Sequence, residues 1–362
     1  MDKFINKLNF DFTTNQLILK LIASIDGFKG KWNIAEIQEN RYLKELRKIA
    51  TIESIGSSTR IEGATMTDKE VQELLNDIKI TKLKSRDEQE VMGYYEALEL
   101  IYENFDNIPL TESYIKQLHQ LLLKYSDKDE RHRGSYKNLS NKVVATYPTG
   151  EQRTIFATTE PMLVEGEMGE LVEWTKQQLE QQDIHPLIVV GSFIYDFLSI
   201  HPFQDGNGRL SRLLTTLCLL QNDYSFIQYI SFENHVEQNK KEYYEVLMAG
   251  QKNRGAEVER IDKWLVFFLD SLNRLTQKLE QKYNVFKSKG GYLNERQKQI
   301  RSFIEENQPV KVSDLASHFT NIQLSTLKKD LQYLRQEQEI QMIGKGKGSI
   351  YLTNEKNDLA KK

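Results

Sequence analysis

Residues 201–212, HPFQDGNGRLSR, bring one histidine, one acid, a Gly-Asn-Gly turn and two arginines into a single short stretch. Pro202 disfavours helical geometry at His201, so a preceding helix should end there. The two glycines can turn the backbone, and the next helix is expected to begin at about Asn207. A glycine-rich loop that leads into a helix N-terminus binds anions through its bare amides and the positive end of the helix dipole.

The charged side chains of this stretch predict phosphate chemistry. Arg209 and Arg212 lie on one face of the first helical turn, and two guanidiniums beside such a loop suit a polyphosphate. Asp205 is out of place beside phosphate unless a cation lies between them, as in common Mg²⁺ sites. His201, with an ordinary pKa of about 6.5, is largely neutral at pH 7 and can take a proton from a hydroxyl. We therefore expect a hydroxyl, deprotonated by His201, to attack a phosphorus of a bound nucleoside triphosphate.

Each feature alone has a more ordinary interpretation. A single histidine is more often structural, a lone Gly-Asn-Gly is usually a turn, and two arginines are usually a solvated helix face. All of them in one loop favour a functional site, with Phe203 pinning the loop to the core. Zinc has little support, because the six histidines are scattered and neither HExxH nor CxxC occurs. Cys218, within LLTTLCLL, is expected to be a buried structural thiol.

The elements around the motif are predicted to be helices, because apolar residues recur three and four apart. One small and apolar stripe at 187–198 leads directly into His201, and a second at 210–220 follows the motif. Further helices are expected at residues 13–27, 33–62, 67–80, 86–105, 111–125, 236–252 and 257–283.

Two segments interrupt this helical body. KVVAT and RTIFATT flank TYPTGEQ and predict a short hairpin, which is either a simple connection or a substrate clamp. SKGGY at 288–292 predicts a linker. Beyond it, helices expected at 293–306, 312–319 and 324–337 precede two strands, EIQMI and SIYL, around GKGKG. That order resembles a winged helix-turn-helix, with GKGKG as the wing turn, since P-loop spacing is lacking.

Composition limits the remaining classes. The chain has 362 residues, a formal net charge of −3 and one cysteine, with 39% hydrophobic and 28% charged residues. The length predicts two or three domains, and the charge argues against a nucleic-acid-binding surface over the whole protein. One cysteine excludes an internal disulfide and fits a reducing cytosol. Neither a cationic leader nor an apolar run of about 18 residues occurs, so we expect a cytoplasmic protein without a membrane segment.

The motif resembles that of the Fic domain, HxFx[D/E]GNGRxxR, at every specified position. IHPLIVVGSFIYDFLSI, KKEYYEVL and WLVFFLDSL extend the resemblance over roughly residues 50–285. The resemblance implies a mainly α fold, a Fic-type helical bundle with a small β-hairpin flap. It also implies a transferase that moves AMP from ATP to a Ser, Thr or Tyr hydroxyl of a target protein or of itself.

The same resemblance assigns roles to individual residues. It implies that His201 is the general base and that Asp205 holds Mg²⁺. Tyr243 matches a position that lines the adenine pocket, with Tyr244 beside it, although a Tyr-Tyr pair at helical spacing is equally compatible with the core. The residues implied to bind the phosphates are Gly206, Asn207, Gly208, Arg209 and Arg212.

The hairpin and the second glycine of the motif refine this prediction. Val143 and Val144 match the flap, which aligns the target side chain by strand addition. Gly208 is intact, which disfavours the relatives that phosphorylate, because these carry a bulkier residue there. Lys137 departs from the arginine that many relatives carry in the segment resembling GSYKN.

SSTRIEGA, residues 57–64, indicates a helix end with Gly63 after Glu62. A glutamate in the last turn opposes the helix dipole and needs a cationic partner. By resemblance, Ser58 and Glu62 match the inhibitory motif [S/T]xxxE[G/N], in which the glutamate pairs with the second arginine, here Arg212, and occupies the γ-phosphate position. A plain capping helix is the alternative. A further hypothesis is that Glu62 orients a water that removes AMP from a modified target.

We expect an N-terminal helical region at 1–110 containing the inhibitory helix at about 51–63, a catalytic domain at 111–285 and a winged-helix domain at 291–355. The segment 291–362 holds 12 basic and 9 acidic residues. The charges expected on its recognition helix and wing are Lys328, Lys329, Arg335, Lys345 and Lys347, offset by Asp330 and Glu337.

Winged helices bind DNA or protein, so DNA is one expected partner. The rival function is a DNA-binding regulator whose Fic-like domain only senses nucleotide. Such a sensor needs the anion loop and the arginines but not His201, and the presence of this base favours the enzyme. Relatives often dimerise, whereas the identity of the target protein is not encoded in a readable way, because a flap recognises backbone.

Overall fold

The computed structural model describes residues 2–36, 41–76, 83–146, 152–288, 293, 295–336, 339–344 and 346–354. The chain divides into two compact units, Met1–Leu279 and Glu280–Lys362. The boundary expected at residue 110 does not coincide with a division between compact units, because the residues on both sides of it belong to the first unit.

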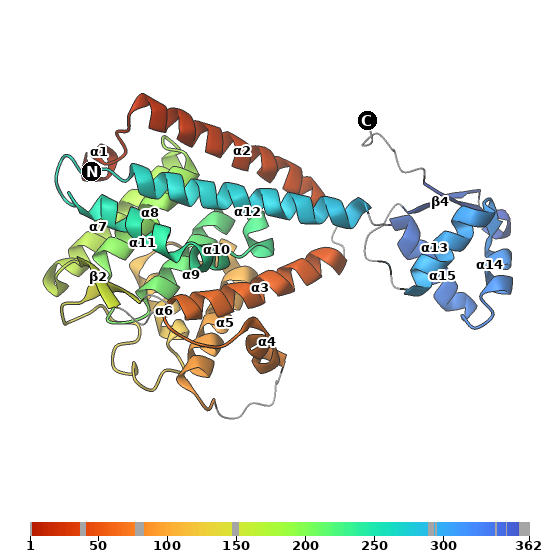
Figure 1. The fold of residues 1–362 in the computed structure, drawn as a ribbon, viewed down its shortest axis with the longest axis horizontal. Helices are drawn as coiled ribbons and strands as arrows, with labels where there is room; N and C mark the ends of the chain where they lie inside the picture. Colours follow the sequence, from red (N-terminus) through yellow and green to blue (C-terminus); the bar gives the residue numbers. More distant parts are fainter. Residues whose placement is uncertain are drawn as a thin grey trace. The chain divides into compact units, whose positions relative to one another are not determined.

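The first unit consists mostly of helices, which confirms the predicted fold class (Figure 1). It contains two 3-10 helices, η1 (Phe105–Asn107) and η2 (Ser225–Tyr229). Its α-helices are α1 (Asp2–Asn6), α2 (Phe12–Glu36), α3 (Arg41–Ile61), α4 (Asp68–Asn76), α5 (Arg86–Asn104), α6 (Glu112–Leu122), α7 (Pro161–Gln181), α8 (Pro186–Ile200), α9 (Asn207–Gln221), α10 (Phe232–Gln238) and α11 (Lys240–Gln251). The α12 helix (Asp262–Ser288) begins in the first unit, and its residues from Glu280 onward belong to the second.

Some helices differ from the prediction. The helix expected at 33–62 corresponds to the last residues of α2 and to α3, with residues 37–40 outside the described part. The helix expected at 236–252 divides at Asn239, whose side-chain Nδ2 donates to the His235 carbonyl at 2.8 Å. Such side-chain competition with the backbone is typical of asparagine. The α7 helix was not predicted, because its two internal glycines lower helix propensity.

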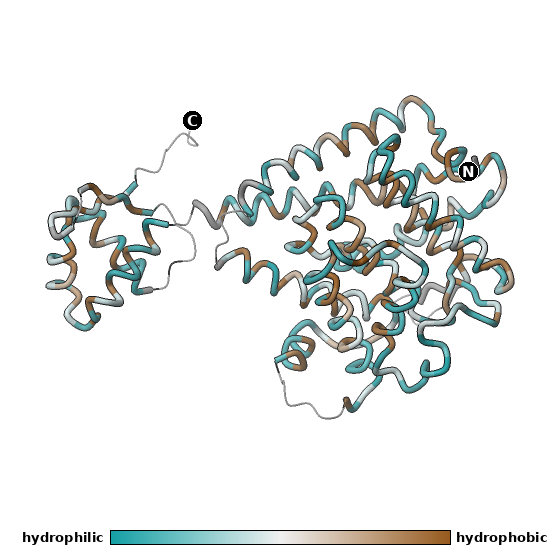
Figure 2. Tube along the Cα trace, turned by 180° about the vertical axis from the view of Figure 1, so that it is seen from behind, coloured by the Kyte–Doolittle hydropathy of each residue, from teal (hydrophilic) through white to brown (hydrophobic). Residues whose placement is uncertain are grey.

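The α8 and α9 helices lie in the interior of the first unit and bury the two predicted stripes (Figure 1). Gly191 lets α12 approach α8, because a Cβ there would lie 2.7 Å from the side chain of Leu265. Trp264 Nε1 of α12 also donates to the Gly191 carbonyl at 2.8 Å. Cys218 of α9 is buried, and burial raises its pKa to about 12, which fits the predicted structural thiol. Figure 2 shows hydrophobic positions alternating with hydrophilic ones along the tube of the first unit.

The predicted hairpin is present between α6 and α7. The β1 strand (Lys142–Thr146) and β2 (Gln152–Ala157) pair antiparallel, with Lys142 opposite Ala157 and Val144 opposite Thr154. A bulge between Val143 and Val144 shifts the register and locally increases the twist. The predicted turn at 147–151 lies outside the described residues.

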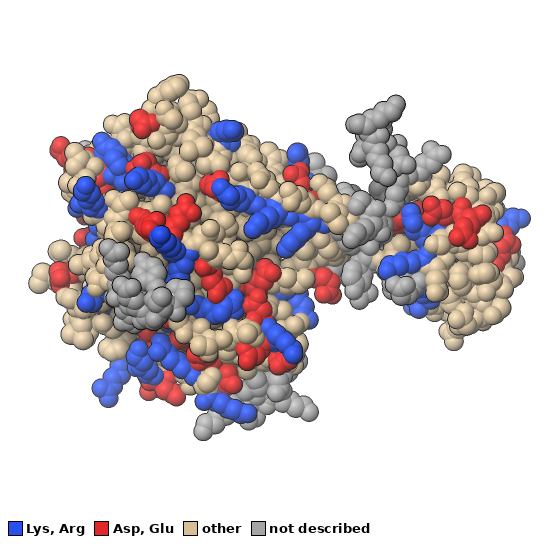
Figure 3. Space-filling model, viewed as in Figure 1, with Lys and Arg blue, Asp and Glu red and all other residues tan. Residues whose placement is uncertain are grey.

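The visible face of the first unit is mixed in charge. On the face drawn in Figure 3, basic and acidic side chains are interspersed. Among the helices within the described residues, none combines the length and the apolar character needed to cross a membrane.

The second unit has its own core and sheet. Its elements are α13 (Glu295–Asn307), β3 (Val310–Lys311), α14 (Val312–His318), α15 (Leu324–Gln336), β4 (Ile340–Ile343), η3 (Gly346–Gly348) and β5 (Ile350–Thr353). The sheet order is β3-β5-β4, antiparallel throughout, and β3 was not predicted. The three helices and the other two strands lie where the sequence predicts them. The winged-helix classification stays a prediction, and Lys345 lies outside the described residues.

The packing of α5 on α6 gives a test of the fold. A Cβ on Gly93 would lie 2.0 Å from the backbone carbonyl oxygen of Leu122, so Gly93→Ala must push the two helices apart. We expect a loss of about 1–3 kcal/mol in the free energy of unfolding. Gly166→Ala is the matched control, because an added Cβ there meets nothing within 4 Å in a solvent-facing part of α7. Thermal unfolding should show a lower midpoint for the first variant and an unchanged or higher one for the second. Equal midpoints for both would contradict this packing.

Candidate active site

His201 ends α8 in a left-handed conformation, with φ 53°, and its own N–H donates to the Phe197 carbonyl. The Nδ1 atom lies 3.2 Å from the carbonyl oxygen of Leu198. A carbonyl can only accept, so Nδ1 carries the proton and Nε2 keeps its lone pair. Burial lowers the pKa of His201 to about 4, so the ring is neutral at physiological pH. The geometry therefore provides a histidine that can accept a proton at Nε2.

The loop after His201 is closed by a side chain of the motif itself. Asn207 Oδ1 accepts from the Phe203 amide at 2.9 Å, and Asn207 Nδ2 donates to the Phe203 carbonyl at 2.7 Å. Gly206, with φ 80°, precedes α9 as its N-cap, so α9 begins at the predicted residue. The Asn207 side chain shapes the loop, and any phosphate contact from Asn207 is left to its backbone amide.

A buried histidine that the sequence did not single out supports this loop. His119 of α6 stacks on Phe203, with ring centroids 3.8 Å apart and planes 15° from parallel. The Gly134 amide donates to His119 Nδ1 at 2.9 Å, which leaves Nε2–H to donate to the Asp205 carbonyl at 3.0 Å. Burial lowers the pKa of His119 to about 4. His119 lies 82 residues before the motif, and nothing in its local sequence indicates this role.

Asp205 and Arg209 form a charged cluster with a second unpredicted residue, Glu90 of α5. Arg209 is 1% exposed, with Nη1 3.1 Å from Glu90 Oε2 and Nη2 3.2 Å from Asp205 Oδ1. Burial opposes ionisation of Asp205, but Arg209 and the Gly206 amide outweigh it and hold its pKa below the ordinary value. Asp205 is therefore a carboxylate at neutral pH.

The other oxygen of Asp205 fits the predicted metal contact. Asp205 Oδ2 has Lys128 Nζ at 3.6 Å and Arg86 Nη2 at 3.9 Å, both longer than a hydrogen bond, and the side chain is 30% exposed. One accessible, ionised carboxylate oxygen beside the predicted phosphate-binding loop suits a Mg²⁺ that is shared with phosphates. The residues present thus fit the cation that the sequence predicts.

Arg212 is held by the helix end that the sequence associates with it. Its Nη2 donates to Glu62 Oε1 at 2.8 Å and to the Ser58 carbonyl at 2.9 Å, while Nε donates to Ser58 Oγ at 2.8 Å. Burial opposes ionisation of Glu62, but Arg212 outweighs it and keeps the pKa of this carboxyl low. Gly63 follows with φ 109°, so the predicted glycine ends this helix. The predicted contact between Glu62 and Arg212 is present.

Gly208 also belongs to this contact. A Cβ on Gly208 would lie 2.2 Å from Glu62 Oε1, so the glutamate reaches Arg212 only because position 208 lacks a side chain. The absence of a side chain in the first turn of α9 therefore serves the Glu62 contact as well as the approach of an anion.

The remaining predicted site residues are Tyr243, Tyr244, Val143 and Val144. Tyr243 and Tyr244 are buried, and Tyr243 packs edge-on against Trp264, with ring centroids 5.7 Å apart. This is the core arrangement that the Tyr-Tyr spacing also allowed, and the adenine-pocket role stays a prediction. Val143 is buried in β1, and the side chain of Val144 lies outside what the structure describes.

The buried His119 ring generates a test of this site by acid. In an unfolded chain His119 takes up a proton below about pH 6.5, whereas in the folded protein it stays neutral down to about pH 4. The unfolded state therefore binds more protons in this window, so stability rises with pH between 4.5 and 6.5. His119→Gln should reduce that slope by about 1.4 kcal/mol per pH unit, measured by urea unfolding at each pH. Phe203→Leu, which weakens the same packing but keeps the ring, should keep the slope; equal slopes in wild type and His119→Gln would refute the assignment.

Comparison with known proteins relates the segment that carries this site to a family. The family model described as Fic/DOC matches residues 109–219. The protein adenylyltransferase Fic of Drosophila willistoni is 28% identical over 209 residues, which are 56% of this chain and 38% of that protein. The Drosophila melanogaster protein of the same name is 28% identical over 192 residues, 52% of this chain and 36% of that protein. The chain thus spans less than two fifths of the length of these curated relatives.

Solved structures show the same fold. A Fic family protein from Desulfovibrio desulfuricans G20 has a TM-score of 0.64 at 22% identity, covering 94% of this chain and 96% of that chain. Fic-1 from C. elegans has a TM-score of 0.58 at 18% identity, covering 75% and 74%. The matched family segment contains His119 and the whole 201–212 motif, whereas Ser58 and Glu62 lie before it. Residues 109–219 thus match the Fic/DOC family, and the fold of the chain is that of solved Fic proteins.

Proposed function

We propose that this protein is a protein adenylyltransferase that transfers AMP from ATP to a Ser, Thr or Tyr hydroxyl of a target protein. The observation that carries the proposal is the free Nε2 of His201 at the start of a loop whose amides and arginines suit a polyphosphate. A nucleotide sensor without catalysis would need the loop but would have no use for a histidine in this tautomer. The names of the curated relatives support the same activity.

The proposed reaction uses residues of this chain as follows. His201 Nε2 accepts the proton of the target hydroxyl, and the hydroxyl oxygen attacks the α-phosphorus of ATP. The bond between the α-phosphorus and its bridging oxygen breaks, so that AMP joins the target and pyrophosphate leaves. Asp205 would hold Mg²⁺, which neutralises phosphate charge when bound. The loop amides, Arg209 and Arg212 orient the phosphates, and the backbone of β1 aligns the target segment.

We propose that Glu62 inhibits this reaction in the resting protein. Arg212 directs Nε and Nη2 at Ser58 and Glu62, so a γ-phosphate that approaches Arg212 must compete with a carboxylate already there. Like charges exclude one another at such distances, and ATP would bind with its α-phosphate misaligned. The proposal extends to the reverse task, in which Glu62 orients a water that removes AMP from a modified target.

Removing the glutamate should activate the protein. We expect Glu62→Gly to raise transfer of label from α-³²P-ATP at least about tenfold, because a charge-assisted contact of about 1.5–3 kcal/mol becomes available to the γ-phosphate. Label on the chain or on lysate proteins is measured on a denaturing gel with Mg²⁺. Glu62→Gly/His201→Ala should show no label. Equal label for wild type and Glu62→Gly would remove the inhibitory role, and no label with any α-labelled nucleotide would remove the transferase.

The wild-type chain gives the measurement for AMP removal. Labelled Glu62→Gly product, freed of ATP, is incubated with unlabelled wild type, which should release AMP. The Glu62→Gly chain is the control and should leave the label in place. Retention of label with both would restrict the proposal to transfer.

A second candidate function, nucleic-acid binding, belongs to the C-terminal unit. Asp330 does not offset the basic residues of α15 as expected: it is 4% exposed and accepts from Arg296 Nε at 2.6 Å and Gln297 Nε2 at 3.0 Å. Lys328 and Lys329 are exposed, and within α15 no exposed acid accompanies them. We propose this helix face as a phosphate-binding surface for DNA.

Lys328→Ala/Lys329→Ala tests this surface. In a gel shift with double-stranded DNA, the double variant should weaken binding at every sequence and lower the salt slope by about 2. Lys298→Ala on α13 is the control and should have a smaller effect. If the wild-type chain does not bind DNA at low salt, the surface is instead a protein contact or plain solvated charge.

A further inference from the structure

The backbone around His201 is held by a segment that precedes the hairpin. The backbone amide of Lys137 donates to the Pro202 carbonyl at 2.8 Å, and its Nζ donates to the Ile200 carbonyl at 3.1 Å. Asn141 Nδ2 donates to the Phe203 carbonyl at 2.9 Å. Two residues thus bind the carbonyls on both sides of His201. The Ile200 carbonyl lies in the last turn of α8, where a helix has no internal donor for it.

These contacts act on the most constrained backbone of the site. A residue other than glycine with φ 53° is held in the left-handed region only if its surroundings fix it. His201 owes the direction of its ring to that conformation. The Lys137 contacts therefore fix where Nε2 points, and not merely where the loop lies.

Lys137 also connects His201 to the hairpin. Its Nζ donates to Thr158 Oγ1 at 2.7 Å and to Asn141 Oδ1 at 2.8 Å, and Thr158 directly follows β2. The three N–H groups of the ammonium are thus all used, on the end of α8, on the base of the hairpin and on Asn141. In the proposed reaction the hairpin aligns the target hydroxyl and His201 accepts its proton. Lys137 therefore connects the hairpin and the base, whose relative position matters for this proton transfer.

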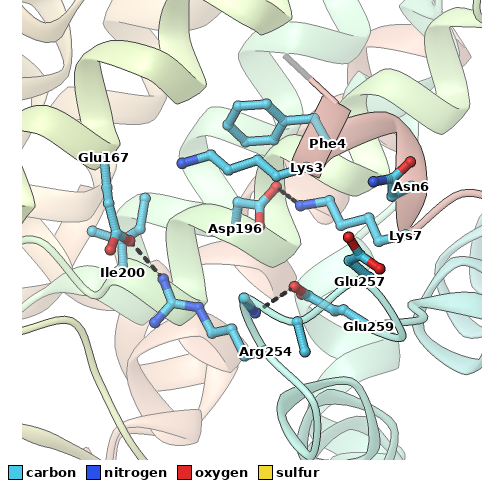
Figure 4. A pocket seen from close by; sticks show the side chains of 12 residues that line it. Lys3, Phe4, Asn6, Lys7, Glu167, Asp196, Ile200, Arg254, Glu257 and Glu259 are labelled. Carbon is cyan, nitrogen blue, oxygen red and sulfur yellow. Dashed lines mark hydrogen bonds and ion pairs between the residues drawn. The ribbon is translucent and has the colours of Figure 1, made fainter.

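Holding backbone and side-chain groups in place does not by itself require a charged side chain, yet the buried Lys137 carries a charge. The side chain is 4% exposed, and within the described part of the chain no carboxylate lies within 4.0 Å of Nζ. Arg254 is a useful contrast, because it supports Thr159 of the same hairpin base but pairs with Glu167 at 2.8 Å. Figure 4 shows that pair in a cavity of about 310 Å³ that Ile200 also lines. A buried ammonium that faces neutral acceptors is costly, whereas a neutral donor would hold the same carbonyl at lower cost.

The cation has an electrostatic consequence for the base. Burial is the main reason that the pKa of His201 is low, and Lys137 acts in the same direction. The other charged groups that act on the ring are Glu62, at the end of α3, and Asp205, in the motif loop; both act in the opposite direction. Lys137 thus offsets two acids that would otherwise favour a protonated ring. Burial lowers the pKa of Lys137 itself to about 8, so it is mostly protonated at pH 7.

We propose that Lys137 is a positioning residue for His201: it fixes the backbone of the base, ties it to the hairpin, and places a positive charge beside the ring. The catalytic part of this inference rests on the proposed transferase function. It differs from that function in assigning a role to a residue outside the 201–212 motif.

The experiment compares Lys137→Met, Lys137→Gln and Lys137→Arg in the Glu62→Gly chain, with Lys20→Met on the exposed side of α2 as the matched control. Transfer of AMP is measured for kcat and KM of ATP. Lys137→Met should lower kcat by roughly 10- to 100-fold with KM for ATP changed less than about threefold, because the phosphate-binding loop is retained. Lys137→Arg should recover most of the loss. A rise in KM that accounts for the whole effect would show a collapsed loop and overturn the proposal.

The charge is tested without any turnover. The ring of His201 is titrated by NMR, its signal being assigned by its loss in His201→Ala. Lys137→Met and Lys137→Gln should both move the midpoint upward by roughly half a pH unit or more, while Lys137→Arg and Lys20→Met should leave it in place. The glutamine variant keeps a donor for the backbone, so it serves if the methionine variant does not fold. An unmoved midpoint in a folded Lys137→Gln would overturn the electrostatic part.

The AMP-transfer assay and the NMR titration together distinguish a failure of this inference from a failure of the proposed function. No transfer by Glu62→Gly with intact Lys137 would refute the transferase, and the titration would still decide whether Lys137 acts on His201. Transfer by Glu62→Gly that Lys137→Met leaves unchanged would refute the positioning role alone.

Discussion

The reversal of the chain between α8 and α9 is the constraint on which the rest of the structure depends. Two buried helices meet through six residues, and His201 must adopt a left-handed conformation for the second helix to return. A turn of this kind exposes carbonyls at one helix end and amides at the other. Asn207 closes the loop through two hydrogen bonds to the backbone of Phe203, and His119 stacks on the Phe203 ring. The turn also leaves His201 Nε2 without a hydrogen-bond partner among the described residues, and the proposed chemistry of the motif depends on this atom.

The second constraint is buried charge. Arg209 and Arg212 are almost completely buried, and an isolated buried guanidinium would be strongly unfavourable. Each therefore has a carboxylate partner from a distant segment: Glu90 of α5, and Glu62, which directly follows α3. The resting protein thus supplies from its own chain the negative charge that a phosphate would bring. In the proposed function, the same two carboxylates keep the buried arginines paired in the empty site and are what an incoming phosphate must displace.

Sequence reasoning succeeded where the signal is local. The apolar stripes at 187–198 and 210–220, the start of α9 at Asn207 and the hairpin all follow from spacing within one segment. It was wrong where a single side chain decides, as at Asn239, which divides one predicted helix. The strand β3 was missed because its two residues are too few to show a periodic pattern. Asp330 was predicted to be a surface charge because its partner, Arg296, lies 34 residues away in the sequence. His119, Glu90 and Lys137 reach the motif through the fold, so no spacing in the sequence could reveal them.

The position of Glu62 is fixed by more than its contact with Arg212. Arg60, two residues earlier, donates to Glu237 of α10 at 2.7 and 3.0 Å, and Lys240 of α11 donates to the Ile61 carbonyl at 2.7 Å. None of these contacts involves the 201–212 motif. A nucleotide that only outcompetes Glu62 for Arg212 therefore leaves the end of α3 where it was, with the carboxylate still nearby. In the proposed inhibition, full release of Glu62 would require that the end of α3 also separate from α10 and α11, so the helix end would act as a rigid obstacle and not as a loose side chain.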